Sequence, residues 1–422
     1  MAVSMDVVVH IGTEKTGTTT LQAMLHRNRE RLMAAGFYFV QSPGTHNNRN
    51  LPVYCLRQRR IDDHCRAQLV DNVEDKIAFQ HHIRTRFDEE IAQLPGWVHT
   101  VLISSEHFHS RLLHDDEVGN LQSLLTPHFE RITILAYLRE QASTAVSAFS
   151  THLTTGGVGR LPLFVREYCT PESSYYNYQE FLGRWSRVFG RADMIVRLFD
   201  PAEFVNGDLV DDFLSVLDPA LIGTLDTGVR PLNESVGQFG QSLLNAVNRH
   251  VPRFIDGVGY DPANVALTEL VVRGTTGPGA TLDEDTRRAV RDDFRDSNEA
   301  VRQEYFPDRD ALFAERPSAV GRAGGAGVAE MSPENEQVLD TIIETLARGA
   351  IPPYYAQLLT GLATTLAPKD PRTARQLLQL ARYLGPVDPD VEARLASWDP
   401  RSYGRREWTG STTASRRHRT SR

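Results

Sequence analysis

The chain has 422 residues, of which 41% are hydrophobic and 24% charged, and its formal net charge is -8. This balance predicts one large folded domain and a smaller one, and it excludes a disordered, collagen-like or disulfide-stapled chain. The negative net charge argues against nucleic acid as a partner, because phosphate backbones attract basic surfaces.

The apolar segments predict a protein without a membrane span. The run ITILAYL at 132–138 is far shorter than the ~20 residues that a membrane helix needs. No basic segment precedes the first apolar stretch, so we expect no secretory signal and a cytoplasmic protein. Cys55, Cys65 and Cys169 are odd in number and lack a CxxC spacing, which predicts free thiols rather than disulfides or a zinc site.

Short apolar runs rich in β-branched residues alternate with helix-length segments along the first half of the chain. The pattern predicts strands at 6–11, 37–40, 101–104, 132–138 and 194–199. It predicts helices at 16–35, through much of 61–95, at 116–126 and after 138. This alternation predicts a three-layer α/β fold, with a mostly parallel sheet covered by helices on both faces.

The second half of the chain reads as helical and ends in a basic tail. Helices are predicted at 209–217, 234–250 and 284–305. Small residues fill 317–333, which predicts a linker between a domain at 1–316 and a small all-helical module at 334–400. Residues 401–422 hold seven arginines and one glutamate, which predicts a basic disordered tail.

A glycine-spaced turn lies between the first strand and the first helix. Gly12 and Gly17 are five positions apart, so the backbone there can approach an anion at the positive end of the helix. A Walker A loop would carry lysine directly after the second glycine, but that position is Thr18, and Lys15 precedes Gly17 by two. The later strands offer no aspartate suited to magnesium, so an ordinary nucleotide triphosphatase is not expected.

The segment Lys15-Thr16-Gly17-Thr18 resembles the phosphosulfate loop of the PAPS-dependent sulfotransferases, in particular the bacterial type. The family's second signature is an arginine that ends a later strand and a serine eight positions on, which Arg139 and Ser147 match. The resemblance covers about residues 5–312, and RPLNESVGQ at 230–238 is similar to bacterial members. There is no clear counterpart of the Arg-Lys-Gly loop of the aryl sulfotransferases, which leaves part of the adenosine site unassigned.

The resemblance implies a P-loop-like domain that binds PAPS (3′-phosphoadenosine 5′-phosphosulfate) as a cosubstrate and requires no metal. It implies that Lys15 stabilises the leaving phosphate, and that backbone N–H groups of residues 16–19, including Thr19, hold it. Arg139 and Ser147 would hold the 3′-phosphate. The reaction implied is in-line transfer of a sulfuryl group to a hydroxyl or amine.

The acceptor needs a general base, for which the sequence offers three candidates near the carboxyl ends of strands. Glu106 and His107 follow the strand at 101–104, and His46 follows the strand at 37–40. Members of the family use either glutamate or histidine, so the resemblance does not choose between them.

The acceptor is expected to be a small molecule or a glycan. The segment 41–97 and the tyrosines of 155–176 are expected to shape its pocket, and the arginines at 57, 59 and 60 would suit an acidic group. Two other functions stay open. One is an atypical P-loop kinase that uses a magnesium nucleotide, with Glu106 as its only plausible acidic residue. The other is a non-catalytic binding protein that retains the turn.

Overall fold

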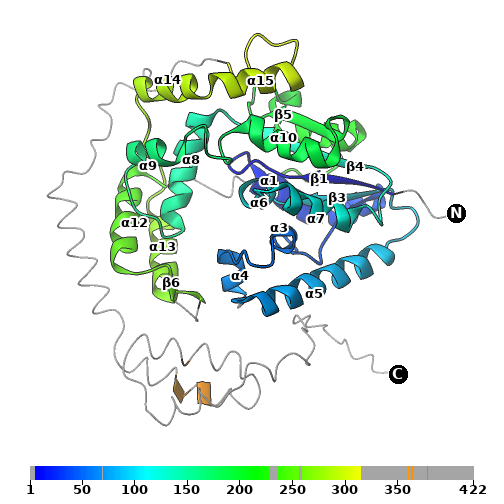
Figure 1. Ribbon diagram of the computed structural model, residues 1–422, viewed down its shortest axis with the longest axis horizontal. Coiled ribbons are helices and arrows are strands. Elements are labelled where there is room, and N and C mark those ends of the chain that lie inside the picture. Colours follow the sequence, from blue (N-terminus) through cyan, green and yellow to red (C-terminus); the bar gives the residue numbers. More distant parts are fainter. Residues whose placement is uncertain are drawn as a thin grey trace, which may run out of the picture. The chain divides into compact units, whose positions relative to one another are not determined.

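The computed structural model describes residues 5–68, 70–228, 236–255 and 259–314, with 360, 361, 363, 364 and 378. The chain divides into two compact units, Met1–Phe254 with Gly259–Ala347, and Ile255–Val258 with Arg348–Arg422. The first unit holds the five-stranded sheet and the site described below (Figure 1). The linker 317–333, the tail 401–422 and nearly all of the helical module 334–400 lie outside the described residues, so these domain boundaries stay predictions.

Five parallel strands form one sheet with β1 at its centre (Figure 1). Their order is β2-β3-β1-β4-β5, and β1 pairs with β3 from Asp6↔Thr100 to His10↔Ser104. The strands are β1 (Asp6–His10), β2 (Phe37–Phe39), β3 (Thr100–Ser104), β4 (Ile132–Leu138) and β5 (Met194–Leu198). All five lie where the sequence predicts them.

Alternating side chains of each strand pack into two separate cores, which confirms the predicted three-layer α/β fold. On β4, Leu135 and Tyr137 face one core, whereas Ile134, Ala136 and Leu138 face the other. The first core includes α1 (Thr18–Arg27), α2 (Arg29–Ala34) and α11 (Leu209–Leu217). The second includes α3 (Asn50–Cys55), α4 (Asp63–Ala67), α5 (Val73–Ala92), α6 (His107–Arg111), α7 (Asp115–Leu125), α10 (Tyr178–Phe189) and α15 (Arg295–Tyr305).

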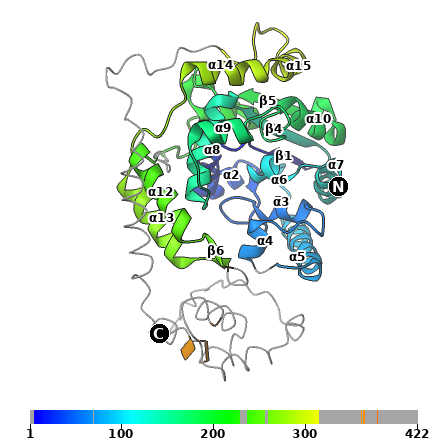
Figure 2. The ribbon, with the colours of Figure 1, turned by 60° about the vertical axis from the view of Figure 1, so that its left-hand side comes forward.

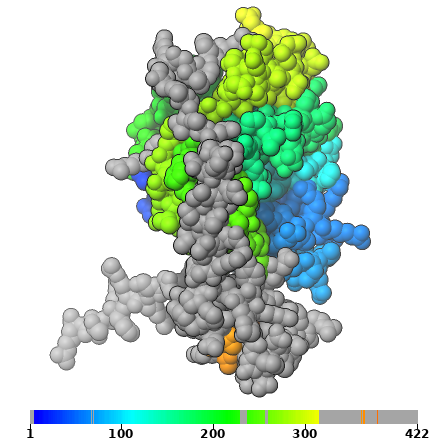
Figure 3. All heavy atoms as spheres, turned by 90° about the vertical axis from the view of Figure 1, so that its left-hand side faces the viewer, coloured from blue at the N-terminus to red at the C-terminus, as the bar shows by residue number. Residues whose placement is uncertain are grey.

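A third core lies among helices beside the sheet (Figure 2). It is built from α8 (Gln141–Thr154), α9 (Leu161–Tyr168), α12 (Gln238–His250), α13 (Pro262–Gly274) and α14 (Glu284–Asp293). Short strands β6 (Phe254–Ile255) and β7 (Gly259–Tyr260) lie between α12 and α13 in the chain, and 3-10 helices span Arg191–Asp193, Val205–Gly207 and Pro219–Leu221. In the space-filling view, the yellow α14–α15 segment and the blue α4–α5 segment lie at opposite ends of the face shown (Figure 3).

Two segments that were each predicted as one continuous helix are interrupted in the structure. The helix predicted at 16–35 is interrupted at Asn28, whose side-chain amide donates to the carbonyls of Met24 and Asp226, both at 2.9 Å. The helix predicted at 284–305 is interrupted at Phe294, which divides α14 from α15. Helices α3, α9, α10 and α13 were not predicted, and the 234–250 helix begins only at Gln238.

Candidate functional site

The glycine loop (residues 11–17) connects β1 to α1 and leaves the start of that helix open. Gly17 has φ 72° and precedes the first residue of α1, and a Cβ there would lie 2.3 Å from Leu209 Cδ2. The N–H groups of Gly17, Thr18 and Thr19 donate to no other described residue. Free N–H groups at the positive end of a ten-residue helix form a site for an anion.

One threonine hydroxyl holds the glycine loop against β4, and a second bonds within the loop. The Thr13 backbone N–H and hydroxyl both donate to the Tyr137 carbonyl at 2.9 Å. The Thr16 hydroxyl donates to the Thr13 carbonyl at 2.6 Å. The Thr16 side chain is therefore engaged within the loop, and only its backbone is left for a ligand. Thr18 is buried and Thr19 is exposed.

Lys15 reaches from the glycine loop to α8. Its ammonium donates to the Thr151 hydroxyl at 2.7 Å. Burial lowers the pKa of Lys15, the negative charges of Glu14 and Glu106 oppose that change, and the Arg139 charge adds to it. Thr151 was not predicted as a site residue, although it lies four positions after Ser147 and so on the same face of α8.

Arg139 follows β4 and is tied to the same loop. Its guanidinium donates to the Lys15 carbonyl at 3.0 Å and lies 5.5 Å from the centroid of the Phe199 ring. The carbonyl of Arg139 accepts a 2.6 Å hydrogen bond from the Tyr178 hydroxyl. Ser147 is half-buried, and its hydroxyl bonds to no other described residue. The structure thus brings Lys15 and Arg139 together, with the Ser147 face of α8 beside them.

Glu106 lies on the opposite side of the glycine loop, at the end of β3. The loop passes so close that a Cβ on Gly12 would lie 3.2 Å from the Glu106 Cα. Glu106 Oε2 accepts a 2.7 Å hydrogen bond from the side-chain amide of Gln22 on α1. Gln22 was not predicted, because nothing in its local sequence distinguishes it from a surface glutamine. Glu106 is therefore held beside the loop, and its charge acts on Lys15.

Both nitrogens of the His107 ring face a charged side chain. Arg49 Nη1 lies 3.2 Å from His107 Nε2, and a guanidinium can only donate, so Nε2 is the acceptor. His107 Nδ1 therefore carries the proton and faces Glu14 Oε1 at 3.5 Å. His107 lies close to Glu106, with 3.9 Å between Nε2 and Oε1, but its lone pair already has a donor.

His46 lies at the other end of α1. It is exposed, its ring stacks on the His26 ring at 4.2 Å between centroids, and its Nδ1 lies 3.1 Å from the Thr45 hydroxyl. His26 belongs to the last turn of α1, whereas Gly17 precedes the first. The structure therefore does not bring His46 to the glycine loop.

Of the arginines at 57, 59 and 60, which were expected to suit an acidic acceptor, two form ion pairs within the protein. Arg57 pairs with Asp116 through two hydrogen bonds of 2.7 Å, and Arg60 pairs with the buried Glu117. Of the tyrosines in 155–176, only Tyr175 contacts the glycine loop, through a 3.0 Å hydrogen bond from its hydroxyl to Glu14 Oε2.

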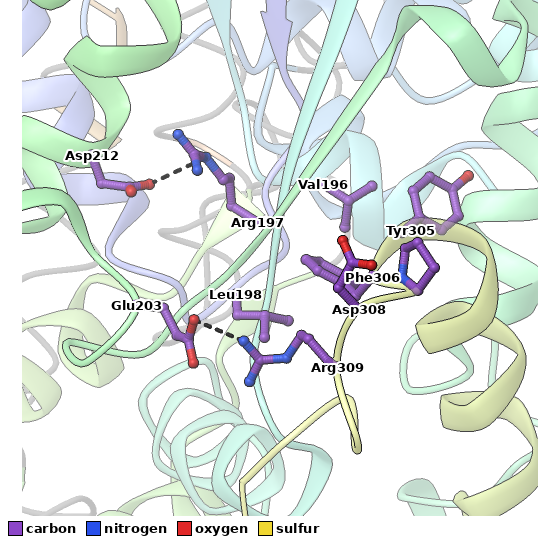
Figure 4. A pocket seen from close by; sticks show the side chains of 10 residues that line it. Val196, Arg197, Leu198, Glu203, Asp212, Tyr305, Phe306, Asp308 and Arg309 are labelled. Carbon is purple, nitrogen blue, oxygen red and sulfur yellow. Dashed lines mark hydrogen bonds and ion pairs between the residues drawn. The ribbon is translucent and has the colours of Figure 1, made fainter.

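A separate cavity of about 360 Å³ lies at the edge strand β5, beside the segment that follows α15 (Figure 4). Its charged side chains pair with one another, Arg197 with Asp212 at 3.7 Å and Arg309 with Glu203 at 2.8 Å. None of the residues of the glycine loop lines this cavity.

The described residues contain no group of three or more histidine, cysteine, aspartate or glutamate side chains placed to hold a metal ion. Within the same residues, no helix is long and apolar enough to cross a membrane. The three cysteines are free, as predicted, and buried.

Comparison with known proteins gives a remote structural likeness. No family model and no curated protein matches the chain. Among solved structures, a sulfotransferase from Alicyclobacillus acidocaldarius is similar with a TM-score of 0.33 and 16% identity. The match covers 67% of this chain and 98% of that one.

Proposed function

We propose that this protein is a sulfotransferase that moves a sulfuryl group from PAPS to a hydroxyl or amine of an acceptor. The observation that carries the proposal is the convergence of Lys15 and Arg139 on the open start of α1, with the Glu106 carboxylate across the loop. This arrangement matches what an anionic donor and a nucleophilic acceptor need on two sides of one reaction centre.

The donor would lie along the glycine loop and α8. The N–H groups of Gly17, Thr18 and Thr19, with that of Thr16, are suited to the 5′-phosphate, because they begin a helix. Arg139 supplies the positive charge for the 3′-phosphate, and the free hydroxyl of Ser147 supplies a further donor on the same side. The hydroxyl of Thr151 accepts a hydrogen bond from Lys15 on this same side of the loop.

The reaction that this site would support is an in-line displacement at sulfur. The acceptor oxygen or nitrogen forms a bond to sulfur while the bond from sulfur to the bridging phosphate oxygen breaks. The products are the sulfated acceptor and adenosine 3′,5′-bisphosphate. The Lys15 ammonium would stabilise the charge that develops on the leaving oxygen, without a metal ion.

Glu106 is the base that the geometry favours. It lies beside Gly12, interacts with Lys15 and has its carboxylate oriented by Gln22. The proton of the acceptor would pass to this carboxylate as the bond to sulfur forms. His107 has its lone pair engaged by Arg49, and His46 lies at the far end of α1. The acceptor would be a small molecule or a glycan, and nothing in the site favours one over the other.

Calorimetric titration of the purified protein tests the class of donor. We expect adenosine 3′,5′-bisphosphate to bind in the micromolar range, Arg139→Ala to abolish that binding, and labelled PAPS to transfer its label to an acceptor. Binding of ATP with Mg²⁺ alone would instead assign an atypical kinase. Absence of binding by either nucleotide would favour a non-catalytic binding protein.

A further inference from the structure

Glu14, the residue before Lys15, has a largely buried carboxylate with two partners, and its backbone N–H has a third. Its Oε2 accepts from the Tyr175 hydroxyl at 3.0 Å, and its Oε1 lies 3.5 Å from His107 Nδ1. Its backbone N–H donates to His109 Nδ1 at 3.3 Å, while His109 Nε2 lies 3.0 Å from the Tyr175 carbonyl. Glu14 thus fastens the glycine loop to α6 and to the segment that carries Tyr175.

The side chains of Glu14 and Lys15 leave the backbone in different directions. Glu14 contacts α6 and Tyr175, whereas Lys15 contacts α8. Lys15 has φ 68°, in the left-handed region that is unfavourable for a residue with a Cβ. Such a conformation persists only when its surroundings impose it. Here the Glu14 contacts hold one side of Lys15, and the Arg139 bond to its carbonyl holds the other.

Glu14 is an anion beside a buried cation. Burial raises the pKa of Glu14, but the interactions of its carboxylate with His107, Ser110 and His109 outweigh burial and lower that pKa to about 2. The charged groups that act on Lys15 are Glu14, Glu106 after β3 and Arg139 after β4, while α8 contributes the neutral hydroxyl of Thr151. The two carboxylates favour protonated Lys15, and burial and Arg139 disfavour it.

We propose that Glu14 is the positioning residue of the glycine loop: its carboxylate contacts Tyr175 and His107, fixes the backbone at Lys15 and supplies a negative charge on the adjoining residue. The role of Lys15 in sulfuryl transfer rests on the proposed function. The effect of Glu14 on Lys15 is independent of the proposed function.

The test compares Glu14→Gln and Tyr175→Phe with the matched control Glu172→Gln, an exposed glutamate near Tyr175. One measurement is kcat for sulfuryl transfer against pH. The other is the pH dependence of Lys15 acylation by acetic anhydride, followed by peptide mass spectrometry. The second measurement needs no turnover.

We expect Glu14→Gln to lower kcat on the order of tenfold. It should also move both the basic limb of kcat and the acylation midpoint of Lys15 to lower pH, because a counter-charge is lost. Tyr175→Phe should lower kcat and leave both pH values in place, because the Glu14 charge remains. Glu172→Gln should behave as the wild type in every measurement.

An unchanged acylation midpoint in Glu14→Gln would overturn the proposal, whether or not the protein turns over. If Glu14→Gln does not fold, Glu14→Asp replaces it. This variant keeps the charge, so kcat should fall while the acylation midpoint of Lys15 stays in place. A midpoint shifted to lower pH in Glu14→Asp would overturn the proposal. A wild type that neither binds adenosine 3′,5′-bisphosphate nor transfers sulfate, with a shifted midpoint in Glu14→Gln, would refute the sulfotransferase function and support the role of Glu14.

Discussion

Lys15 and Glu106 lie on two sides of one loop, and the reaction that we propose needs them in opposite charge states. Lys15 must be protonated to stabilise a leaving oxygen, and Glu106 must be ionised to accept a proton. The two side chains have separate hydrogen-bond partners: Lys15 donates to a hydroxyl on α8, and Glu106 accepts from an amide on α1.

Replacing Lys15 by methionine should remove charge stabilisation in the transition state. We expect Lys15→Met to lower kcat by about a hundred- to a thousandfold. Binding of adenosine 3′,5′-bisphosphate should weaken far less, because the backbone N–H groups and Arg139 remain. Single-turnover transfer and calorimetry measure the two quantities separately. Full turnover by this variant would exclude the role assigned to Lys15.

The candidate bases can be separated by conservative substitutions. We expect Glu106→Gln to lower kcat by about a hundred- to ten-thousandfold, because the amide cannot accept the proton. His46→Gln should keep the wild-type rate, because its contacts are with His26 and Thr45. Steady-state kinetics with a fixed acceptor measures both. The reverse pattern would assign the base to His46.

At the scale of elements, the junction between the glycine loop and α1 leaves no room for a side chain at Gly17. Gly17→Ala would place a Cβ 2.3 Å from Leu209 Cδ2 of α11, in a backbone conformation with φ 72°. We expect a loss of stability of about 1–3 kcal/mol and weaker binding of adenosine 3′,5′-bisphosphate. Urea unfolding and calorimetry measure these effects. Gly223→Ala, which has open space at its Cβ and φ 78°, controls for backbone strain alone.

The sheet can be predicted from the sequence because each strand is a short apolar run that is visible locally. The five β-branched runs and the two glycines of the loop are local features, and the fold confirms them. The break at Asn28 was missed because it depends on Asp226, 198 positions away. Thr151 and Gln22 were missed for the same reason, since their partners Lys15 and Glu106 lie 136 and 84 positions away.

At the scale of the whole molecule, two buried histidines should set the response to acid. Burial lowers the pKa of His10 from 6.5 to about 3. Burial also lowers the pKa of His109 from 6.5 to about 4, although Glu14 and Tyr175 make smaller opposing contributions. In the unfolded chain these two histidines take up protons as pH falls through 6.5, whereas in the folded protein they stay unprotonated. Their contribution to stability is therefore full above pH 6.5 and is lost as pH falls toward 4.

We expect the free energy of unfolding to fall between pH 6.5 and 4 by up to about 1.4 kcal/mol per pH unit for each of these histidines. Urea unfolding at a series of pH values measures the slope. His10→Gln should reduce it, and the exposed His81→Gln should leave it unchanged. An equal slope in His10→Gln would show that His10 does not contribute.

The central place of β1 also bears on the order in which the protein forms. β1 is synthesised before the other strands of its sheet, and both of its partners come much later, with β3 beginning at Thr100 and β4 at Ile132. Parallel pairing over such separations is slow, because a long loop must close before the contacts form. The glycine loop therefore acquires its shape only after β4 has been synthesised, because Thr13 donates to the Tyr137 carbonyl and Arg139 donates to the Lys15 carbonyl.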